Sequence, residues 1–423
     1  MNTTLIYNFS LYIVLFLFTI LFFKRNHVAW FVAGFYALGS LCAFFVPMYN
    51  HYYVADIFIT TNYSKTALLY LFLTFCLFFT PLLQSGINYS APILHIPSNK
   101  NGVLFFCSRV YFCILFISIL VASYCLLKNG VSFNTFFTSK EDAFALMASY
   151  GSGFSTLFKF SETLSDVFLV YSFYLLFNHP VKKYAFSLIV GILTFSLLYA
   201  LLTMSRNSML HTIFSLFLLM MLFRMYSNTK IYDFFKGIAI FFIAIILGAM
   251  LFVSIQRFFS DRGDVEYTQF IMLRYAGEPM LNFGSWIDRI QDNTLGVKNF
   301  SSILSMLHLE PTRDFSEIRN FCYRTTQIPS YIFFSFIGSF VCDFGFLITF
   351  FIGLLLAIFF SKRNKTIQYN TSFTRISFFY FYSQFLLDGY FFFSYASRNV
   401  KLLVTVFFLL FLKFSLGNQK GNE

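Results

Sequence analysis

Arginine dominates the basic residues between positions 257 and 330, and this bias is the first chemical signal in the sequence. Seven of the eight basic residues there are arginines, with Lys298 as the exception. A guanidinium binds phosphate through two parallel N–H groups and stays charged in a dry site, whereas a lysine ammonium is a hydrated point charge. The bias predicts a site for an anionic, phosphate-bearing substrate. Pairing with the nine carboxylates of the same segment is the alternative.

Three arginines are the candidates for binding a diphosphate: Arg206, Arg274 and Arg289. Arg206 lies in Met-Ser-Arg-Asn-Ser between two apolar stretches, with no acidic residue near it in the sequence. Arg274 is followed by Gly277 and Pro279, which we expect to turn the backbone close to a ligand. Glu278 follows Arg274 by one helical turn, so a plain Arg-Glu pair is the other interpretation.

A transfer to a hydroxyl group also needs a base, and the candidates in order of preference are Asp343, Glu278 and His308. Asp343 lies in Cys-Asp-Phe-Gly-Phe near the end of an apolar stretch, where a carboxylate is costly unless it is paired or faces water. His308 is the only histidine between 257 and 330, and histidine is the residue type most often used as a general base.

Other polar residues inside apolar stretches raise the same question of who their partners are. Asp388 and the set Lys159, Glu162 and Asp166 are of this kind, and Lys159 and Glu162 have a spacing that allows mutual neutralisation. His211 has no such polar company in the sequence, which argues against a membrane acyltransferase with an intramembrane histidine cluster. No zinc, phosphate-loop or dinucleotide signature is present, so we expect no metal and no cofactor.

These residues must be positioned by apolar helices. The chain has 58% hydrophobic and only 11% charged residues, which excludes an ordinary soluble fold. Apolar stretches long enough to cross a bilayer recur along it. They cover 5–23, 28–48, 66–84, 110–127, 154–177, 184–203, 207–223, 236–256, 338–360, 376–396 and 399–415. The sequence therefore predicts an all-α, polytopic transmembrane bundle of about eleven spans, within a range of 10–12.

Lysine and arginine should be enriched in short cytoplasmic loops. With the amino terminus outside, fifteen basic residues fall in inside loops and six in short outside loops. Lys401 is one of the six outside residues. This predicts a first bundle at 1–256, a large extracytoplasmic loop at 257–330 and final transmembrane helices at 331–423. Within the loop, Phe270–Ile290 and Phe300–Leu309 are amphipathic and are expected to form short helices on the membrane face. The predicted number of spans depends on the polar break between 204 and 208. If the two flanking stretches formed one helix, every later loop would lie on the opposite side of the membrane.

Three marks resemble the O-antigen polymerase family, the bacterial oligosaccharide repeat unit polymerases. They are Ser205-Arg206-Asn207, Arg274-Tyr275-Ala276-Gly277, and the stretch from Ile337-Gly338 to Cys342-Asp343-Phe344-Gly345. The resemblance implies a metal-independent glycosyltransferase of the bacterial inner membrane. Such an enzyme moves a growing glycan from undecaprenyl diphosphate to the next lipid-linked repeat unit on the outer face. Many family members are drawn with twelve spans, which differs from the eleven expected here.

For this chain the resemblance implies a diphosphate-binding role for Arg206 and Arg274 only. The implied partners are the lipid-linked oligosaccharide and membrane lipid, with a chain-length regulator and a flippase as further candidates, and the product is an O-antigen or capsule glycan. The net charge of +12 reflects helix anchoring, and no nucleic acid is expected. An O-antigen ligase is the nearest alternative, and a lipid-linked oligosaccharide flippase or transporter is the alternative from another class.

Overall fold

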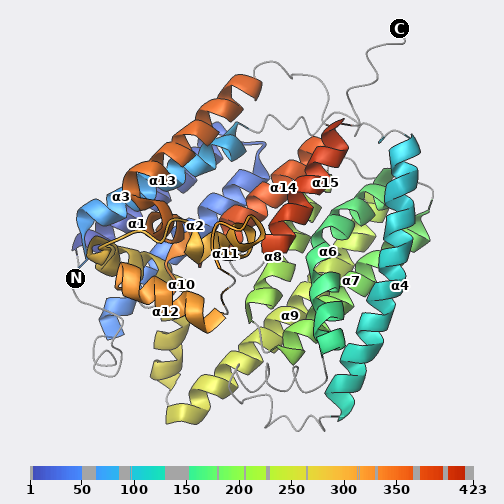
Figure 1. The fold of residues 1–423 in the computed structure, drawn as a ribbon, viewed down its shortest axis with the longest axis horizontal. Helices are drawn as coiled ribbons and strands as arrows, with labels where there is room; N and C mark the ends of the chain where they lie inside the picture. The colour runs from blue at the N-terminus through green and yellow to red at the C-terminus, as the bar shows by residue number, and fades with distance from the viewer. Residues whose placement is uncertain are drawn as a thin grey trace. The chain divides into compact units, whose positions relative to one another are not determined.

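The structure is a computed structural model, and it describes residues 3–49, 63–84, 96, 98–128, 152–178, 181–203, 206–224, 229–262, 265–311, 313, 315–328, 332–364, 372–393 and 399–414. Helices account for almost all of these residues, and no β-strand is found among them (Figure 1). The all-helical fold class expected from the sequence is therefore confirmed.

Every apolar stretch predicted as a span contains a helix, although the helix in the predicted span 376–396 ends at Asp388 and residues 394–396 lie outside the described residues. The helices in the first part of the chain are α1 (Thr3–Phe22), α2 (His27–Phe45), α3 (Lys65–Leu83), α4 (Ser98–Lys128), α6 (Ser152–Asn178), α7 (Lys182–Leu202), α8 (Arg206–Phe223) and α9 (Thr229–Arg262). They are followed by α10 (Val265–Trp286), the short η4 (Ile287–Arg289), α11 (Val297–Met306), α12 (Phe315–Thr326), α13 (Ser335–Asn364), α14 (Phe373–Asp388) and α15 (Asn399–Phe414).

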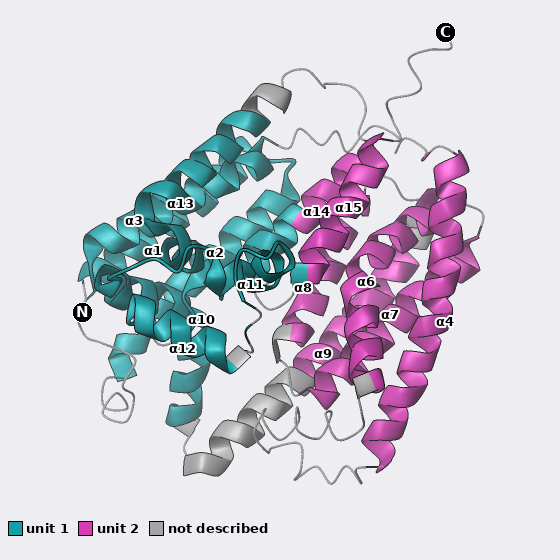
Figure 2. Ribbon diagram, in the orientation of Figure 1, with its two compact units in different colours: residues 1–87, 262–368, 382–399 teal, residues 88–261, 369–381, 400–423 magenta. Residues whose placement is uncertain are grey.

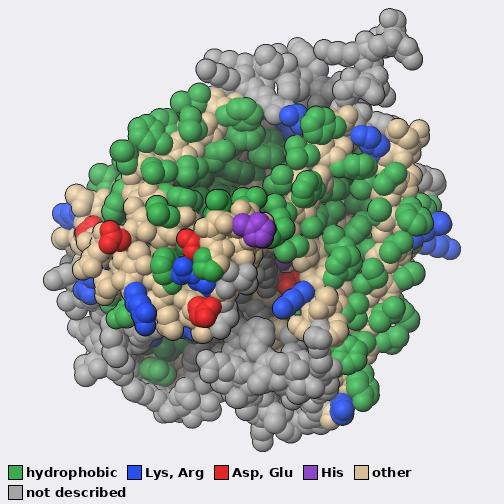
Figure 3. Space-filling model, in the orientation of Figure 1, with side chains coloured by type: hydrophobic (Ala, Val, Ile, Leu, Met, Phe, Trp, Pro, Cys, Tyr) green, Lys and Arg blue, Asp and Glu red, His purple; other side chains and the backbone are tan. Residues whose placement is uncertain are grey.

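Seven helices in the described part of the chain are long and apolar enough to cross a membrane: α1, α2, α3, α4, α6, α7 and α13. Most of them expose large apolar side chains. Along α1, Asn8 and Thr19 are fully buried, whereas Leu21 and Phe22 are exposed. Hydrophobic side chains also cover much of the described surface in Figure 3, and charged ones are sparse. An apolar outer face with buried polar side chains such as Asn8 is what a lipid solvent favours.

The break after Leu202 separates two helices that fold back on each other. Leu197 and Ala200 of α7 pack in one apolar cluster with Met209 and Ile213 of α8. In a single continuous helix, Leu197 and Ile213 would lie about 24 Å apart. α7 and α8 are therefore two helices that pack on each other and not one kinked helix.

Contacts divide the chain into two units, which are described separately here (Figure 2). Unit 1 comprises residues 1–87, 262–368 and 382–399, and unit 2 comprises 88–261, 369–381 and 400–423. In unit 1, α2 packs on α1 and α10, and α3 packs on α13. In unit 2, α4, α6 and α7 pack on one another, and α8 packs on α6 and α7. The division expected from the sequence, at 1–256, 257–330 and 331–423, rests on which side of a membrane each segment lies. It therefore stays a prediction.

Gly277 and Pro279 do not turn the backbone, contrary to the expectation from the sequence. Both lie inside the continuous helix α10. A Cβ atom on Gly277 would stand 2.5 Å from both Cα and N of Ala43 in α2. Glycine is needed here because two helix backbones touch. The segment is thus built into the bundle of unit 1, with Phe270 and Phe283 fully buried.

The Cys-Asp-Phe-Gly-Phe segment interrupts α13. Gly345 has φ of 80° and ψ of 171°, which is outside the helical region and favours glycine. The carbonyls freed on the N-terminal side of this kink find partners in the preceding loop. Thr294 N–H donates to Cys342 O at 2.9 Å, and Leu295 N–H donates to Asp343 O at 3.0 Å. The kink thereby docks residues 294–299 onto α13.

Candidate functional site

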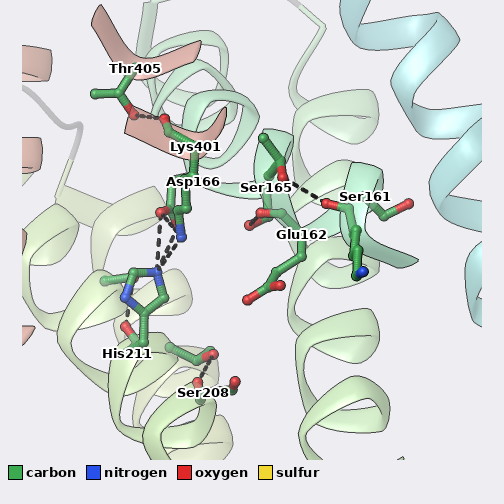
Figure 4. Close-up of polar contacts among 12 residues, drawn as sticks. Ser161, Glu162, Ser165, Asp166, Ser208, His211, Lys401 and Thr405 are labelled. Atoms are coloured by element: carbon green, nitrogen blue, oxygen red, sulfur yellow. Dashed lines mark hydrogen bonds and ion pairs between the residues drawn. The ribbon is translucent and has the colours of Figure 1, made fainter. Parts of the chain in front are cut away.

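Three ionisable side chains from three helices of unit 2 meet in a buried cluster (Figure 4). His211 Nε2 in α8 lies 3.1 Å from each carboxylate oxygen of Asp166 in α6. Lys401 Nζ, in the first turn of α15, lies 2.6 Å from Asp166 Oδ2 and 3.2 Å from His211 Nε2. We call these three residues the DHK cluster. The Asp166 and Lys401 side chains are only 5% and 6% exposed, and that of His211 is 18% exposed.

Local sequence explains how each helix presents its residue. On α8, Ser208, His211, Thr212 and Ser215 recur at intervals of three and four, so they share one face. Thr212 Oγ1–H donates to Ser208 O at 2.9 Å and Ser215 Oγ–H donates to His211 O at 2.6 Å, so these hydroxyls are satisfied within the helix. Polar residues on one face and apolar residues elsewhere turn that face toward the protein interior.

The charges of the cluster balance one another. Asp166 and Lys401 have opposite charge and are in direct contact, as burial requires, because an isolated charge in a dry interior is strongly destabilising. The sequence argument that an intramembrane carboxylate must be paired is confirmed for Asp166. The carboxylate also fixes the ring orientation of His211, which is the arrangement that prepares a histidine for proton transfer.

A small pocket opens beside the cluster. It is lined by Glu162, Ser165, Phe195, Ser196, Tyr199, Ser208, His211, Thr212 and Lys401. Hydroxyl groups and a carboxylate therefore line the pocket beside His211. The Phe195 and Tyr199 rings, stacked with centroids 5.8 Å apart, form one wall. The pocket provides space beside His211 for a polar group such as a hydroxyl.

Two expectations from the sequence are wrong at this site. His211 does have polar company, supplied by residues 45 and 190 positions away in the chain. Lys401 is a buried helix residue and not an outside-loop anchor, because its charge is held by Asp166. A signal for this pairing was present, since an intramembrane carboxylate predicts an intramembrane cation.

Arg206, the arginine favoured most by the sequence, is the first residue of α8. Its side chain lies outside the described residues. Its backbone stands five residues before His211, which is about 7.5 Å along the helix axis. The same helix therefore begins at the predicted diphosphate ligand and carries the clustered histidine.

Asp343 is fully buried in unit 1, where its carboxylate caps α11. Asp343 accepts hydrogen bonds from Thr294 Oγ1, from Lys298 N at 3.1 Å and from Asn299 N at 3.1 Å. The last two are first-turn amides of α11, which a carboxylate satisfies well. Lys298 Nζ lies 3.4 Å from Cys342 Sγ. Its pKa is raised, since burial lowers it but the neighbouring thiols and Asp343 outweigh that effect.

The remaining predicted residues are spread over unit 1. Arg274 Nε lies 4.0 Å from Glu278 Oε2, which confirms the interpretation of an Arg-Glu pair. Glu278 is buried and accepts a hydrogen bond from Asn282 Nδ2 at 3.1 Å. Arg289 is exposed and stacks 4.3 Å from the Trp286 ring. His308 is exposed, with φ of 57°. Their proposed roles stay predictions.

Comparison with known proteins adds no relative: no protein-family model matches the chain, and no curated protein or solved structure is significantly similar to it.

Proposed function

We propose that this protein is a membrane glycosyltransferase that polymerises oligosaccharide repeat units carried on undecaprenyl diphosphate. The observation that supports this most is helix α8, which begins at Arg206 and carries His211 into a buried cluster with Asp166. One element thus combines a cation for a diphosphate with a carboxylate-oriented base. An apolar helical protein is also the scaffold that a lipid-linked substrate requires.

In the proposed reaction, His211 is the general base. Asp166 accepts a hydrogen bond from the Nε2–H group of His211, which leaves the basic lone pair on Nδ1. The acceptor hydroxyl gives its proton to His211 while its oxygen attacks the anomeric carbon of the donor. The bond from that carbon to the diphosphate oxygen breaks, and the diphosphate leaves with the bonding electron pair. Arg206 stabilises the departing negative charge without a metal ion.

The residues chosen from unit 1 take supporting roles in this proposal. The Asp343 carboxylate accepts hydrogen bonds from Thr294 and from the α11 amides. Asp343 therefore attaches residues 294–299 to α13. Arg274 and Arg289 remain diphosphate ligands predicted from the sequence alone, and within unit 1 Arg289 is exposed whereas Arg274 lies mostly buried beside Glu278. His308 and Glu278 rank behind His211 as the base, since Glu278 already bonds Asn282 and pairs with Arg274.

The proposed setting is a bacterial inner membrane, crossed about eleven times with the amino terminus outside. Residues 257–330 face the outer side, where the lipid-linked repeat units are joined. A flippase would deliver these units, and a chain-length regulator would control the extent of polymerisation. O-antigen and capsule glycans are both compatible products.

A second candidate is a membrane acyltransferase that modifies a sugar hydroxyl. The DHK cluster favours it, because an intramembrane histidine beside a carboxylate is the base that such an enzyme needs. Here the acceptor hydroxyl would attack an acyl carbonyl. The glycan would then gain an ester without becoming longer.

Deletion of the gene and complementation with variants tests the proposal. Loss of a polymerase leaves lipid carrying one repeat unit, loss of a ligase leaves none, and loss of a flippase traps the unit inside. An acyltransferase deletion leaves long chains that lack an ester, which mass spectrometry detects.

We expect Arg206→Ala and His211→Gln each to leave single units. Arg109→Ala is the matched control, since Arg109 is exposed on α4 and stacks on Phe105. Normal long chains from both site variants, at normal protein level, would refute the assignment.

A further inference from the structure

Four large apolar side chains are exposed on the short segment around α11. Leu295 is 79% exposed, Met306 65%, Leu307 61% and Leu309 67%. All four lie outside the candidate membrane spans of the described residues. Polar groups border them, including the exposed Asp292 and the pair formed by Glu310 and Arg313 at 3.0 Å. We call Leu295, Met306, Leu307 and Leu309 the apolar rim.

Hydrogen bonds attach the apolar rim to α13 just before the kink at Gly345. Leu295 N–H donates to Asp343 O, and the Asp343 carboxylate caps the start of α11. Just beyond the Gly345 kink, α13 presents its own exposed apolar residues, beginning with Phe346 at 38%, Leu347 at 71% and Ile348 at 54%. The rim therefore lies next to the place where the apolar outer surface of α13 begins.

Backbone conformation holds the two ends of the rim in place. Leu295 and His308 have φ of 51° and 57°, in the left-handed region that non-glycine residues rarely adopt. Leu309 N–H donates to Leu304 O at 2.9 Å, so the turn at His308 closes back onto α11. These turns leave Leu295 and Leu309 largely exposed instead of folding them inward.

We propose that the apolar rim inserts into the interfacial layer of the lipid bilayer beside α13. Its occupant is the bilayer itself, because the rim continues the apolar outer surface of α13 and is bordered by charged groups suited to headgroups. Apolar side chains with a polar border are the composition of interfacial membrane anchors. The insertion holds residues 287–311 against the membrane surface. This inference stands whether or not the proposed function is correct.

Tryptophan fluorescence in vesicles tests the insertion. Leu307→Trp is placed in the full-length protein, which is reconstituted in phosphatidylcholine vesicles containing lipid brominated at carbons 6 and 7 or at carbons 11 and 12. The signal of the native Trp30 and Trp286 is subtracted with the parent protein. We expect blue-shifted emission and at least twofold stronger quenching by the shallow bromine than by the deep one.

Asn320→Trp is the matched control, since Asn320 is an exposed polar residue on the neighbouring helix α12. Its emission should resemble that of tryptophan in water, with little quenching by either lipid. Water-like emission from Leu307→Trp overturns the proposal. Blue-shifted emission without quenching also overturns it, because the rim would then be covered by protein. Equal quenching at positions 307 and 320 overturns it as well, since the rim would have no preferred lipid contact.

Discussion

Asp166 and Lys401 depend on each other for burial, and this makes a prediction at the scale of single residues. Asp166→Asn would leave the Lys401 ammonium buried without its counter-charge. Removing one partner of a buried pair costs about 3–5 kcal/mol. We therefore expect Asp166→Asn to lower the thermal unfolding temperature of the detergent-solubilised protein by several degrees, measured by differential scanning fluorimetry.

The control is the double variant Asp166→Asn with Lys401→Met, in which neither charge remains. It should be more stable than the sum of the two single effects predicts, because the unpaired charge has gone. Strict additivity would show that the two side chains do not interact in the folded protein.

Cys322 makes a second prediction at this scale. The thiol is 3% exposed on α12, and burial raises its pKa to about 11. Because only the thiolate is nucleophilic, almost none of it reacts at pH 8, well below that pKa. We expect Cys322 to resist iodoacetamide in the folded protein and to react after denaturation, as peptide mass spectrometry measures. A cysteine introduced by Asn320→Cys, exposed on the same helix, should react readily, and equal labelling of the two would contradict the burial.

The sequence identified single residues of the site but not their grouping. The sequence singles out Arg206 because no acidic residue is near it, and it marks Asp166 only as one of a polar set, with Lys159 and Glu162, that needs partners in an apolar stretch. The partners of Asp166 were not recognised, since they approach only when α6, α8 and α15 pack together. Asp343 was recognised for the same reason as Asp166. Its use as a cap for α11 depends on the kink at Gly345, which no spacing in the sequence specifies.

At the scale of elements, Gly277 sets how closely α10 approaches α2. Gly277→Ala would place a Cβ atom 2.5 Å from the backbone of Ala43, so one helix must shift. Overpacking of this kind costs about 1–3 kcal/mol. We expect a lower unfolding temperature for this variant in the same fluorimetric assay.

Gly102→Ala is the matched control, because it adds the same methyl group to helix α4 with nothing within 4 Å. The better helix propensity of alanine should make it neutral or stabilising by up to about 1 kcal/mol. A destabilisation of Gly102→Ala as large as that of Gly277→Ala would remove the packing argument.

Helices were easier to predict than their surroundings, for a physical reason. A stretch such as 66–84 is apolar throughout, so its length and solvent preference identify it before any packing is known. Helix α10 is mixed, with Arg274 and Glu278 among apolar residues, and the same pattern suits a surface helix. Contact with α2 and α3 decides its place. That contact joins positions more than 200 residues apart, which local periodicity does not reveal.

At the scale of the whole molecule, the turn between α7 and α8 controls the predicted topology. If both helices cross the bilayer, the chain has eleven spans, with residue 327 outside and the carboxyl end inside. Alkaline phosphatase, which is active only outside the cytoplasm, should then be inactive when fused after Asn178 and active when fused after Gln327. Green fluorescent protein at the carboxyl end should fluoresce, because it folds inside. If α7 and α8 instead form one re-entrant hairpin, the chain crosses the bilayer two times fewer before Gln327. Gln327 then still lies outside, so the phosphatase fusions after Asn178 and Gln327 give the same results as before. A further phosphatase fusion after Thr203 separates these cases, since it is active only if α7 reaches the outer side. Inactivity of the fusion after Thr203 would show that Arg206 does not lie on the outer side. It would then contradict the proposed contact between Arg206 and a diphosphate on the outer face.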